Sequence, residues 1–296
     1  MKLHTCSFDN QVNTIAARLA QHATQALLDE VHLSPKPGLV DRRGSGAHKD
    51  LTLALMECSA HSLTPTFHAL VLRGWQSAMD IALRQEVGRL GREGERQMMA
   101  ATGGVNTHRG AIWALGLLVT AMAVSGATAK IEDTVQYAAN LASLPDDVSP
   151  IMFSKGRHAT QRYRVPGARE EAQQGFPHIM QLALPQLRLS RLQGAKEKEA
   201  RLDALIAIMT SLSDTCVLTR GGMPALIAMQ QGAKAVLQAG GMSQRAGREA
   251  FFQLEQRMLT DNASPGGAAD LLAATLFLDR VARSDEQDIR GYYGTN

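Results

Sequence analysis

The sequence has little cysteine, and no two cysteines are spaced as CxxC. Its three cysteines, Cys6, Cys58 and Cys216, lie far apart among 296 residues. This spacing argues against disulfides and against a structural zinc site, and it favours the reducing environment of the cytoplasm. We therefore expect a cytoplasmic protein without disulfides.

Long apolar runs are also missing. The first residues contain no apolar stretch of the kind found in signal peptides. The longest apolar run, residues 111–125, is short for a membrane span and includes Gly116 and Thr120. We predict that this run is a buried core helix and that the protein does not bind membranes.

The sequence has no strong excess of charge of either sign. The net charge is +3 and the calculated pI is 8.8, which is too mild to indicate nucleic-acid binding, since that requires a concentrated basic face. The balance suits small anionic ligands. Apolar residues make up 45% of the chain, enough for a sizeable core.

Aromatic residues are scarce at 4%, and Ala, Leu, Met, Gln and Arg dominate instead. This composition, with apolar residues recurring at a period of about 3.6, favours helix over strand. We predict a single compact all-α domain over residues 1–283 with glycine-rich active-site loops, and a polar, frayed tail over 284–296. The longest irregular segment, 144–165, is either a solvated loop or a basic lid. The expected helices span 10–33, 50–62, 65–87, 93–101, 107–125, 131–143, 168–188, 197–212, 223–239, 244–259 and 265–282.

The segment 34–50 combines two prolines and three glycines with several basic side chains. It cannot be helical, and its glycines would allow a ligand to approach the backbone closely. One interpretation is a phosphate cradle built from backbone N–H groups and Lys or Arg side chains. The alternative is an ordinary connection between helices with solvated charges. The basic side chains are Lys36, Arg42, Arg43, His48 and Lys49.

The segment 102–110 precedes the apolar helix. Asn106 or Thr107 is the expected N-cap, which places His108 and Arg109 in the first turn. Positive side chains there oppose the helix dipole, and an anion bound at the helix N-terminus would remove the conflict. The alternative is that Arg109 extends to water.

The third segment, 213–222, lies between two apolar helices. Asp214 is expected to follow the C-terminal end of a helix, where a carboxylate faces the negative end of the dipole and needs a cation. Arg220 could be that partner, and a bound metal ion is the alternative.

The fourth segment, 264–278, begins with Ser264 as the expected N-cap and Pro265 as the first helical residue. Asp270 then lies in a helix that is apolar nearly all round. Because an unpaired buried carboxylate is costly, Asp270 is expected to face a cation, a metal ion or a ligand.

Glu30 lies at the centre of the apolar stripe of the first helix. A carboxylate in a core stripe is unusual, so we expect a functional partner, although the stripe could also end one turn earlier and leave Glu30 exposed. Glu95 and Glu171 lie on more polar helices and are predicted to be solvated. Four histidines without ligand spacing are predicted to be structural: His22, His61, His68 and His178.

Taken together, these stretches resemble the triphosphoribosyl-dephospho-CoA synthase family. The matching stretches cover most of the chain in a consistent order and are specific as a set. They are Glu30–Asp50, TGGVNTHRG at 102–110, GAREEAQQGFP at 167–177, the DT and RGG pair at 214–222, and SPGGAADLL at 264–272.

The resemblance implies that ATP and 3′-dephospho-CoA are the substrates and that adenine is released. The 2′-hydroxyl of dephospho-CoA would attack C1′ of the ATP ribose with one inversion. The product is the precursor of the prosthetic group of malonate decarboxylase or citrate lyase, and it would pass to a carrier-protein transferase. The run RRGSGAH at 42–48 is closer to the malonate decarboxylase branch.

This chemistry needs a carboxylate that accepts the hydroxyl proton, and cations for the triphosphate. We predict that four acids, Glu30, Asp41, Asp214 and Asp270, form a convergent site that binds Mg²⁺ and supplies the general base, because clustered carboxylates repel one another unless a cation joins them. The predicted ligand-binding residues are Lys36, Gly38, His48, Asn106, His108, Arg109, Arg220, Gly221, Gly266 and Gly267.

Two other functions would use the same groups. A metal-dependent, all-α hydrolase of nucleotides would use water as the acceptor. A non-catalytic nucleotide-binding module would assist the assembly of a carrier-protein complex. Release of adenine that depends on dephospho-CoA separates the transferase from both alternatives.

Overall fold

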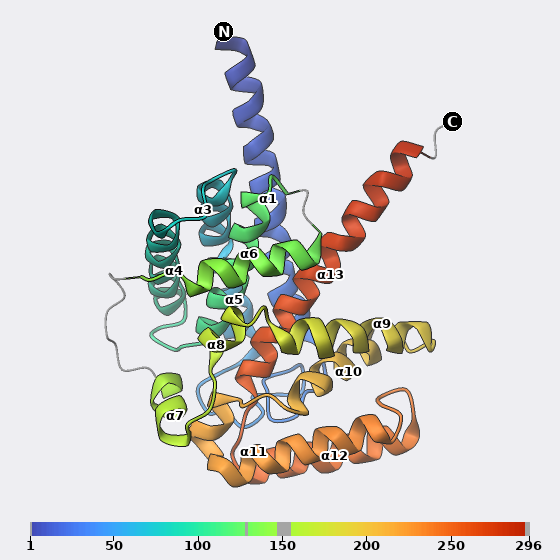
Figure 1. Ribbon diagram of the computed structural model, residues 1–296. Coiled ribbons are helices and arrows are strands. Elements are labelled where there is room, and N and C mark those ends of the chain that lie inside the picture. Colours follow the sequence, from blue (N-terminus) through green and yellow to red (C-terminus); the bar gives the residue numbers. More distant parts are fainter. Residues whose placement is uncertain (1, 128–129, 147–154, 294–296) are drawn as a thin grey trace.

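The computed structural model describes residues 2–127, 130–146 and 155–293 and shows an all-helical molecule (Figure 1). These residues contain no strand, only an isolated bridge between Asp41 and Gly44. The predicted all-α fold is therefore confirmed. Within the same residues, no helix is both long enough and apolar enough to cross a membrane.

The first half of the chain contains α1 (Lys2–His32), α2 (Leu53–Ser62), α3 (Thr64–Gly74), α4 (Ile81–Ala101), α5 (Arg109–Val124) and α6 (Ile131–Ser143). The second half contains α7 (Lys155–Tyr163), α8 (Ala168–Gln173), the π-helix η1 (His178–Ala183), α9 (Leu184–Leu192), α10 (Glu197–Met209), α11 (Thr215–Gln238), α12 (Arg245–Thr260) and α13 (Gly266–Tyr293).

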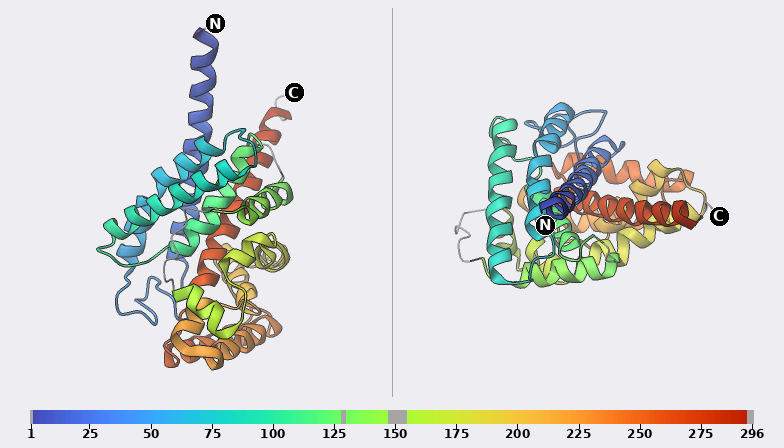
Figure 2. Two further views of the ribbon diagram at one scale, coloured as in Figure 1. Left: turned by 60° about the vertical axis from the view of Figure 1, so that its left-hand side comes forward. Right: turned by 90° about the horizontal axis from the view of Figure 1, so that it is seen from above.

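Helix α5 forms the centre of the core. It corresponds to the longest apolar run, and nearly all of its residues are buried, because a helix that is apolar all round must be covered on every side. It packs against α1, α3, α4, α6 and α13. The long helices α1 and α13 also pack together, and their far ends project from the same side of the body (Figures 1 and 2). At the opposite end, α11 and α12 lie side by side.

Several helix boundaries differ from the prediction. The expected helix over 65–87 is two helices, because the Asp80 side chain caps α4 by accepting the N–H of Leu83. The expected helix over 168–188 is broken after α8, where Gly175 and Phe176 have positive φ. Local side-chain caps and positive-φ residues interrupt segments whose apolar period is continuous.

Three segments are more helical than predicted. Residues 155–163 of the expected irregular segment form α7, a short polar helix that has no apolar stripe in sequence; residues 147–154 of that segment lie outside the described residues. Helix α11 begins at Thr215 and contains a kink at Gly222, whereas a start at residue 223 was predicted. Helix α13 continues to Tyr293, whereas a frayed tail was predicted from residue 284.

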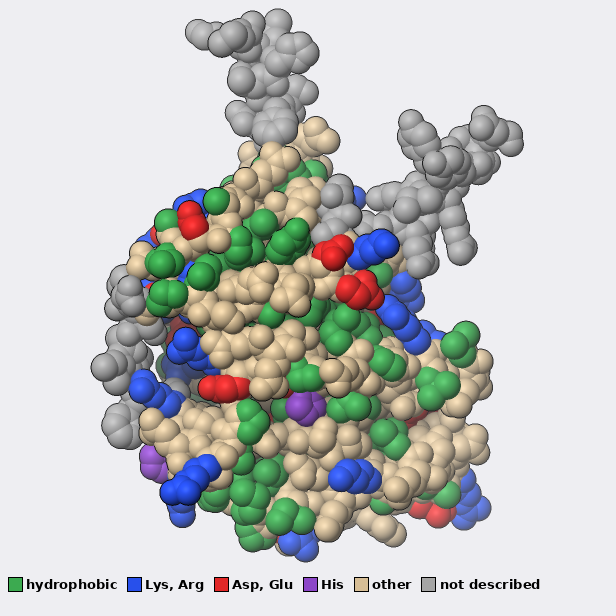
Figure 3. Space-filling view, in the orientation of Figure 1, with side chains coloured by type: hydrophobic (Ala, Val, Ile, Leu, Met, Phe, Trp, Pro, Cys, Tyr) green, Lys and Arg blue, Asp and Glu red, His purple; other side chains and the backbone are tan. Residues whose placement is uncertain are grey.

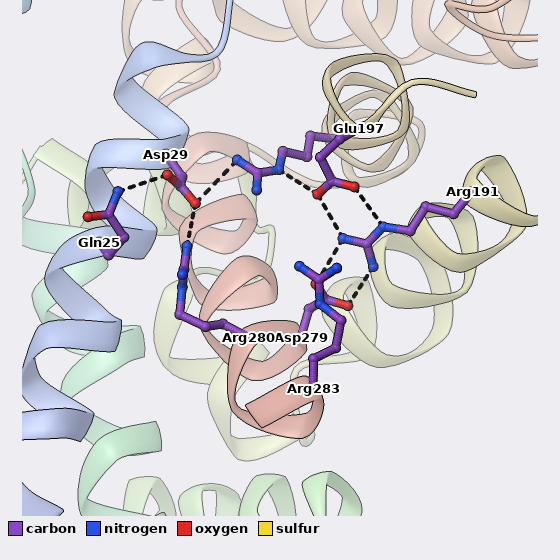
Figure 4. A network of polar contacts seen from close by, with 8 residues as sticks. Gln25, Asp29, Arg191, Glu197, Asp279, Arg280 and Arg283 are labelled. Carbon is purple, nitrogen blue, oxygen red and sulfur yellow. Dashed lines mark hydrogen bonds and ion pairs between the residues drawn. The ribbon is translucent and has the colours of Figure 1, made fainter. Parts of the chain in front are cut away.

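A network of ion pairs holds α1, α9, α10 and α13 together (Figure 4). Asp29 of α1 accepts from Arg280 at 2.6 Å and lies 3.2 Å from Arg201. Arg191 joins Glu197 and Asp279 at 2.7–2.9 Å. The hydrogen bonds from Arg191 outweigh burial and lower the pKa of Glu197 to about 2. This network fixes α13, whose first turns carry part of the candidate site.

Candidate active site

The four glycine-containing segments, which are far apart in sequence, form a single cluster in space. Segment 34–50, which follows α1, lies beside the starts of α11 and α13 (Figure 1). The N-terminal end of α5 meets α13 at Asp270. The cluster therefore contains the N-termini of three helices, which present partial positive charge and free N–H groups.

Lys36 is buried, which excludes the solvated charge that was one of the two alternatives left open by the sequence. Its side chain is 2% exposed, and Nζ donates to the backbone carbonyl of Glu30 at 2.8 Å and to the Glu30 carboxylate at 2.6 Å. Glu30 is itself 4% exposed, so its predicted place within the apolar stripe is confirmed. Each buried charge compensates the other. The short contact matters, because an ion pair inside a protein is stable only with good geometry.

Asp41 is engaged within its own loop. Its carboxylate accepts the N–H groups of Lys36 and Arg43 at 2.8 and 2.7 Å and also binds the Arg43 guanidinium. Arg43 in turn binds Glu255 of α12. Burial opposes ionisation of Asp41, but the hydrogen bonds from Arg43 and Lys36 outweigh it and hold the pKa below its usual value. Asp41 therefore shapes the loop, and its carboxylate is turned toward Arg43 and α12.

The glycines of segment 34–50 were expected to let a ligand approach the backbone closely. At Gly38 the group that approaches is another part of the chain. Gly38 has φ +70°, and a Cβ atom there would lie 2.4 Å from the carbonyl oxygen of Ala263. Gly46 shows the same relationship with the carbonyl of Leu39. Gly38 therefore lets segment 34–50 pack tightly onto the connection between α12 and α13, and Gly46 lets the segment fold closely on itself.

Arg220 connects the same two segments. Its guanidinium binds the carbonyl of Ala47 and both the carbonyl and side chain of Asn262. His48 shares its Nε2 with the Ser264 hydroxyl at 2.7 Å. Burial, together with the Arg220 charge, lowers the pKa of His48 to about 4. His48 is therefore neutral at pH 7, contrary to its predicted role as a cation, and Arg220 does not pair with Asp214.

His108, rather than Asn106 or Thr107, is the N-cap of α5. It is buried, its Nδ1 shares a hydrogen bond with Ser59 at 2.7 Å, and its Nε2 has no partner. Burial and the nearby Lys36 ammonium lower the pKa of His108 to about 3. The expected positive charge on His108 is therefore absent, and its unpaired Nε2 is free to meet a ligand.

Arg109 is the first residue of α5, and Glu95 of α4 neutralises it. Arg109 Nε donates to Glu95 at 3.1 Å, with both side chains about one-third exposed. Glu95 was predicted to be solvated, and the structure corrects this. Next to Arg109, Asn106 and the backbone of Gly103 and Gly104 are exposed, and space is open above both glycines.

Asp270 projects from α13 onto the first turn of α5. A Cβ atom at Gly110 would lie 2.0 Å from Asp270 Oδ2, so only glycine fits at the second residue of α5. Burial and the neighbouring carboxylates of Glu30 and Asp214 raise the pKa of Asp270 well above its usual range, while the N–H of Ala111 opposes this. Asp270 is half-buried, so it is the most accessible of the three acids.

Asp214 is the N-cap of α11 and does not face the C-terminal end of α10. Its Oδ1 accepts the N–H groups of Cys216 and Val217, and its Oδ2 accepts that of Ala268 at 2.9 Å. Burial raises the pKa of Asp214 against these hydrogen bonds. The predicted conflict with a helix dipole is wrong: the carboxylate stabilises two helix N-termini at once.

Three glycines allow close packing around Asp214 and the start of α11. A Cβ atom at Gly267 would lie 3.1 Å from Asp214 Oδ2, and one at Gly266 would lie 3.0 Å from the Cys216 sulfur. At Gly221 the added atom would lie 2.4 Å from Ala225. These predicted binding glycines therefore allow close helix packing.

Three of the four predicted acids, Glu30, Asp214 and Asp270, thus lie near one another, and Asp41 is turned away. Within the described residues, no group of three or more His, Cys, Asp or Glu side chains is placed to hold a metal ion. Glu30 has Lys36 as its cation, and Asp214 has backbone N–H groups. Asp270 is the acid of the three whose charge is least compensated.

Some residues of the site have no signal in sequence. Ser59 of α2 binds both His108 and Thr107, but a lone serine in a helix carries no pattern. Glu171 was predicted to be solvated, yet it is buried and binds the N–H and Nδ1 of His178 at 3.0 and 2.7 Å. Both pairings depend on turns that bring distant segments together.

Comparison with known proteins identifies the family of the chain. The family model described as ATP:dephospho-CoA triphosphoribosyl transferase matches residues 16–288. The chain belongs to this family. The resemblance noted from the motifs is thereby confirmed, and the match spans all of the segments that form the site.

Relatives of this transferase family are similar over nearly their whole length. A 2-(5″-triphosphoribosyl)-3′-dephosphocoenzyme-A synthase from Klebsiella pneumoniae is 67% identical over 89% of this chain and 94% of its own. Probable synthases of the same name from Pseudomonas fluorescens Pf-5 and Azotobacter vinelandii are 55% and 57% identical, covering 96% and 90% of this chain and 98% and 92% of theirs. No solved structure matches the chain.

Proposed function

We propose that the chain is a triphosphoribosyl-dephospho-CoA synthase. The 2′-hydroxyl oxygen of 3′-dephospho-CoA attacks C1′ of the ATP ribose, the bond from C1′ to adenine breaks, and adenine leaves with a proton. The triphosphate stays on the transferred ribose. Family membership and the similarity to named synthases support this reaction. The single structural observation that carries it is the convergence of Glu30, Asp214 and Asp270 at the N-terminus of α5.

Asp270 is our candidate for the general base that accepts the 2′-hydroxyl proton. It is the most accessible acid of the three, and Glu30 and Asp214 raise its pKa. A carboxylate whose pKa is raised toward the working pH is a stronger base than a solvated one. The same negative environment would stabilise the oxocarbenium-like charge that develops on the ribose, as in inverting glycosidases.

The positive end of the site is proposed to bind the triphosphate. Arg109, the exposed backbone of Gly103 and Gly104, and Asn106 lie at the start of α5. A helix N-terminus with free N–H groups is a ready anion site. The unpaired Nε2 of His108 adds a polar group at the same place. Lys36 and Arg220 are proposed to support these residues through their contacts with Glu30 and Asn262.

Mg²⁺ is proposed to accompany the triphosphate. The acid that would help to hold the ion is Glu30, which already binds a cation, the Lys36 ammonium, while Asp270 stays free of metal as the base. Mg²⁺ commonly combines one or two carboxylates with phosphate oxygens. When bound, it would neutralise the triphosphate and lower the pKa of Asp270. Asp41 and Asp214 are not proposed as direct ligands of Mg²⁺, since their oxygens accept other hydrogen bonds.

Incubation of the protein with ATP, with and without 3′-dephospho-CoA, tests the reaction. Adenine that appears only with dephospho-CoA is the expected result. Adenine or phosphate released from ATP alone would indicate a hydrolase instead, and tight binding of ATP without turnover would indicate a binding module. The RRGSGAH run favours a role in malonate decarboxylase biosynthesis, with a carrier-protein transferase as the next enzyme; genes for citrate lyase subunits beside this one would contradict it.

A further inference from the structure

A cavity whose mostly apolar lining includes two arginines and two acids lies along α4 and α5, beyond the acids of the candidate active site. Its volume is about 150 Å³, and in Figure 3 basic side chains gather at a hollow on the α4 side of the body. Glu95 lines the cavity and also binds Arg109 at the start of α5, so the cavity adjoins the proposed triphosphate site. It is lined by Leu70, Arg84, Val87, Gly88, Gly91, Arg92, Glu95, Ile112, Trp113, Gly116, Leu117 and Asp146.

Two guanidinium groups in this cavity share one carboxylate oxygen. Asp146 Oδ2 accepts from Arg92 at 2.8 Å and, at a longer 3.3 Å, from Arg84. The Arg84 side chain is 8% exposed, and its Nε is buried without a partner, as is the second oxygen of Asp146. Buried polar atoms are nearly always hydrogen-bonded, so two orphans in one cavity indicate that a partner is missing.

The charges around Arg84 also favour an anion. Burial lowers the pKa of the Arg84 guanidinium; Asp146 opposes this, and Arg169 and Arg92 add to it. The lining holds two arginines and two acids, but Arg84 and Arg92 share Asp146, and Glu95 is paired with Arg109. An anion bound here would accept charge-assisted hydrogen bonds from Arg84 and Arg92, of which Asp146 accepts only a part.

The walls of the cavity hold the Arg84 guanidinium in one orientation. It lies over the Trp113 ring, 5.3 Å from the ring centroid. A Cβ atom at Gly88 would lie 2.1 Å from Asp146 Oδ2, whereas Gly91 faces open space. A rigid, planar guanidinium with an unpaired Nε suits the tetrahedral oxygens of a phosphate.

We propose that this cavity is a phosphate subsite, in which Arg84 and Arg92 bind a terminal phosphate of a nucleoside triphosphate and release Asp146. Whole-ligand pockets are typically roughly 300–1,000 Å³, so a cavity of 150 Å³ accommodates one end of a ligand. A triphosphate has a free end, whereas the pyrophosphate of dephospho-CoA is internal. The identity of the triphosphate as ATP rests on the proposed function.

Trp113 provides the measurement. The chain has two tryptophans, so a Trp75→Phe protein reports the cavity alone through its fluorescence. Inorganic tripolyphosphate and ATP are expected to change this fluorescence at saturating concentrations, and dephospho-CoA is not. Arg92→Ala in this background should weaken tripolyphosphate binding on the order of tenfold, because hydrogen bonds to charged groups are strong.

Two further variants separate this role from a general effect of charge or folding. Arg96→Ala removes the same charge from α4 at an exposed residue paired with Glu93, and it should leave affinity unchanged. Asp146→Asn removes the competing carboxylate and should raise tripolyphosphate affinity several-fold, although a purely structural ion pair would show no gain. Thermal melts check that each variant is folded.

Equal losses in Arg92→Ala and Arg96→Ala, weaker binding in Asp146→Asn, or a response to dephospho-CoA alone would overturn the subsite. Failure of the proposed function looks different: the unmodified protein would release no adenine, while tripolyphosphate still changed the Trp113 signal. Unaltered KM for ATP in Arg92→Ala, with normal adenine release, would leave the function standing and remove the subsite.

Discussion

The Lys36 ammonium lies 2.6 Å from the Glu30 carboxylate, and neither side chain is more than 5% exposed. Glu30 in turn contributes to the raised pKa of Asp270. The buried pair therefore controls how much negative charge Asp270 experiences. Removal of one partner would leave an uncompensated buried charge, which is more damaging than replacement of both.

Asp270→Asn is expected to stabilise the protein without ligand while abolishing turnover. The pKa of Asp270 is raised in the folded state, so ionisation of this carboxyl favours unfolding, and the penalty grows as pH rises above the unfolded value of about 3.9. Asparagine removes the penalty. We expect Tm at pH 7 to rise by roughly 2–4 °C, and the difference to vanish at acidic pH where both side chains are neutral. A lower Tm at pH 7 would contradict this account.

Glu30→Gln is expected to shift the pH dependence of catalysis. The negative charge of Glu30 raises the pKa of Asp270, so its removal lowers that pKa. If Asp270 is the base, the acidic limb of the kcat/KM profile moves to lower pH. Because Lys36 loses its partner, the variant is also expected to be less stable, and the profile is measured below its Tm. An unshifted limb would remove Asp270 from the role of base.

Gly110→Ala is expected to reduce activity even though alanine has the higher helix propensity. The added methyl would lie 2.0 Å from Asp270 Oδ2 and would displace the carboxylate. Misplacement of a catalytic group by about 1 Å can cost on the order of a hundredfold in rate. Thermal melts check that the variant is folded. Unchanged adenine release by the folded variant would show that Asp270 is not catalytic.

Arg191→Ala is expected to weaken the protein at neutral pH and to reduce its sensitivity to acid. Arg191 lowers the pKa of Glu197 to about 2, so this carboxylate contributes stability above its unfolded pKa of about 4.3. That contribution is lost as pH falls through the folded value. Tm measured from pH 7 to pH 2 should therefore fall less steeply in the variant. Arg245→Ala, from an exposed pair with Glu249, should leave the profile unchanged, since such pairs contribute little.

Chelation tests the proposed Mg²⁺. Excess EDTA is expected to stop adenine release from ATP and dephospho-CoA, and added Mg²⁺ to restore it, because the triphosphate needs a cation beside Glu30 and Asp270. Thermal stability without substrate is expected to change little, since Lys36 already compensates Glu30. Full turnover in EDTA would exclude the metal.

Sequence patterns located the site better than they described it. The apolar stripe placed Glu30 in the core, and the apolar run placed α5 at the centre, because helix period and burial follow directly from side-chain polarity. The helix positions predicted for Asp214 and His108 were wrong, because they depended on where helices begin. A shift of a few residues turns the expected C-terminal carboxylate into the N-cap of α11.

The sequence by itself determined the all-helical fold, the family, and the segments that form the candidate site, since these depend on composition, period and motif. Only the tertiary structure decided the partners: Glu30 with Lys36, Arg109 with Glu95, and Asp270 with Gly110. Charges pair across distances that helix packing sets, and no local pattern encodes those distances. The same packing determined that Asp41 faces Arg43 while Glu30, Asp214 and Asp270 converge.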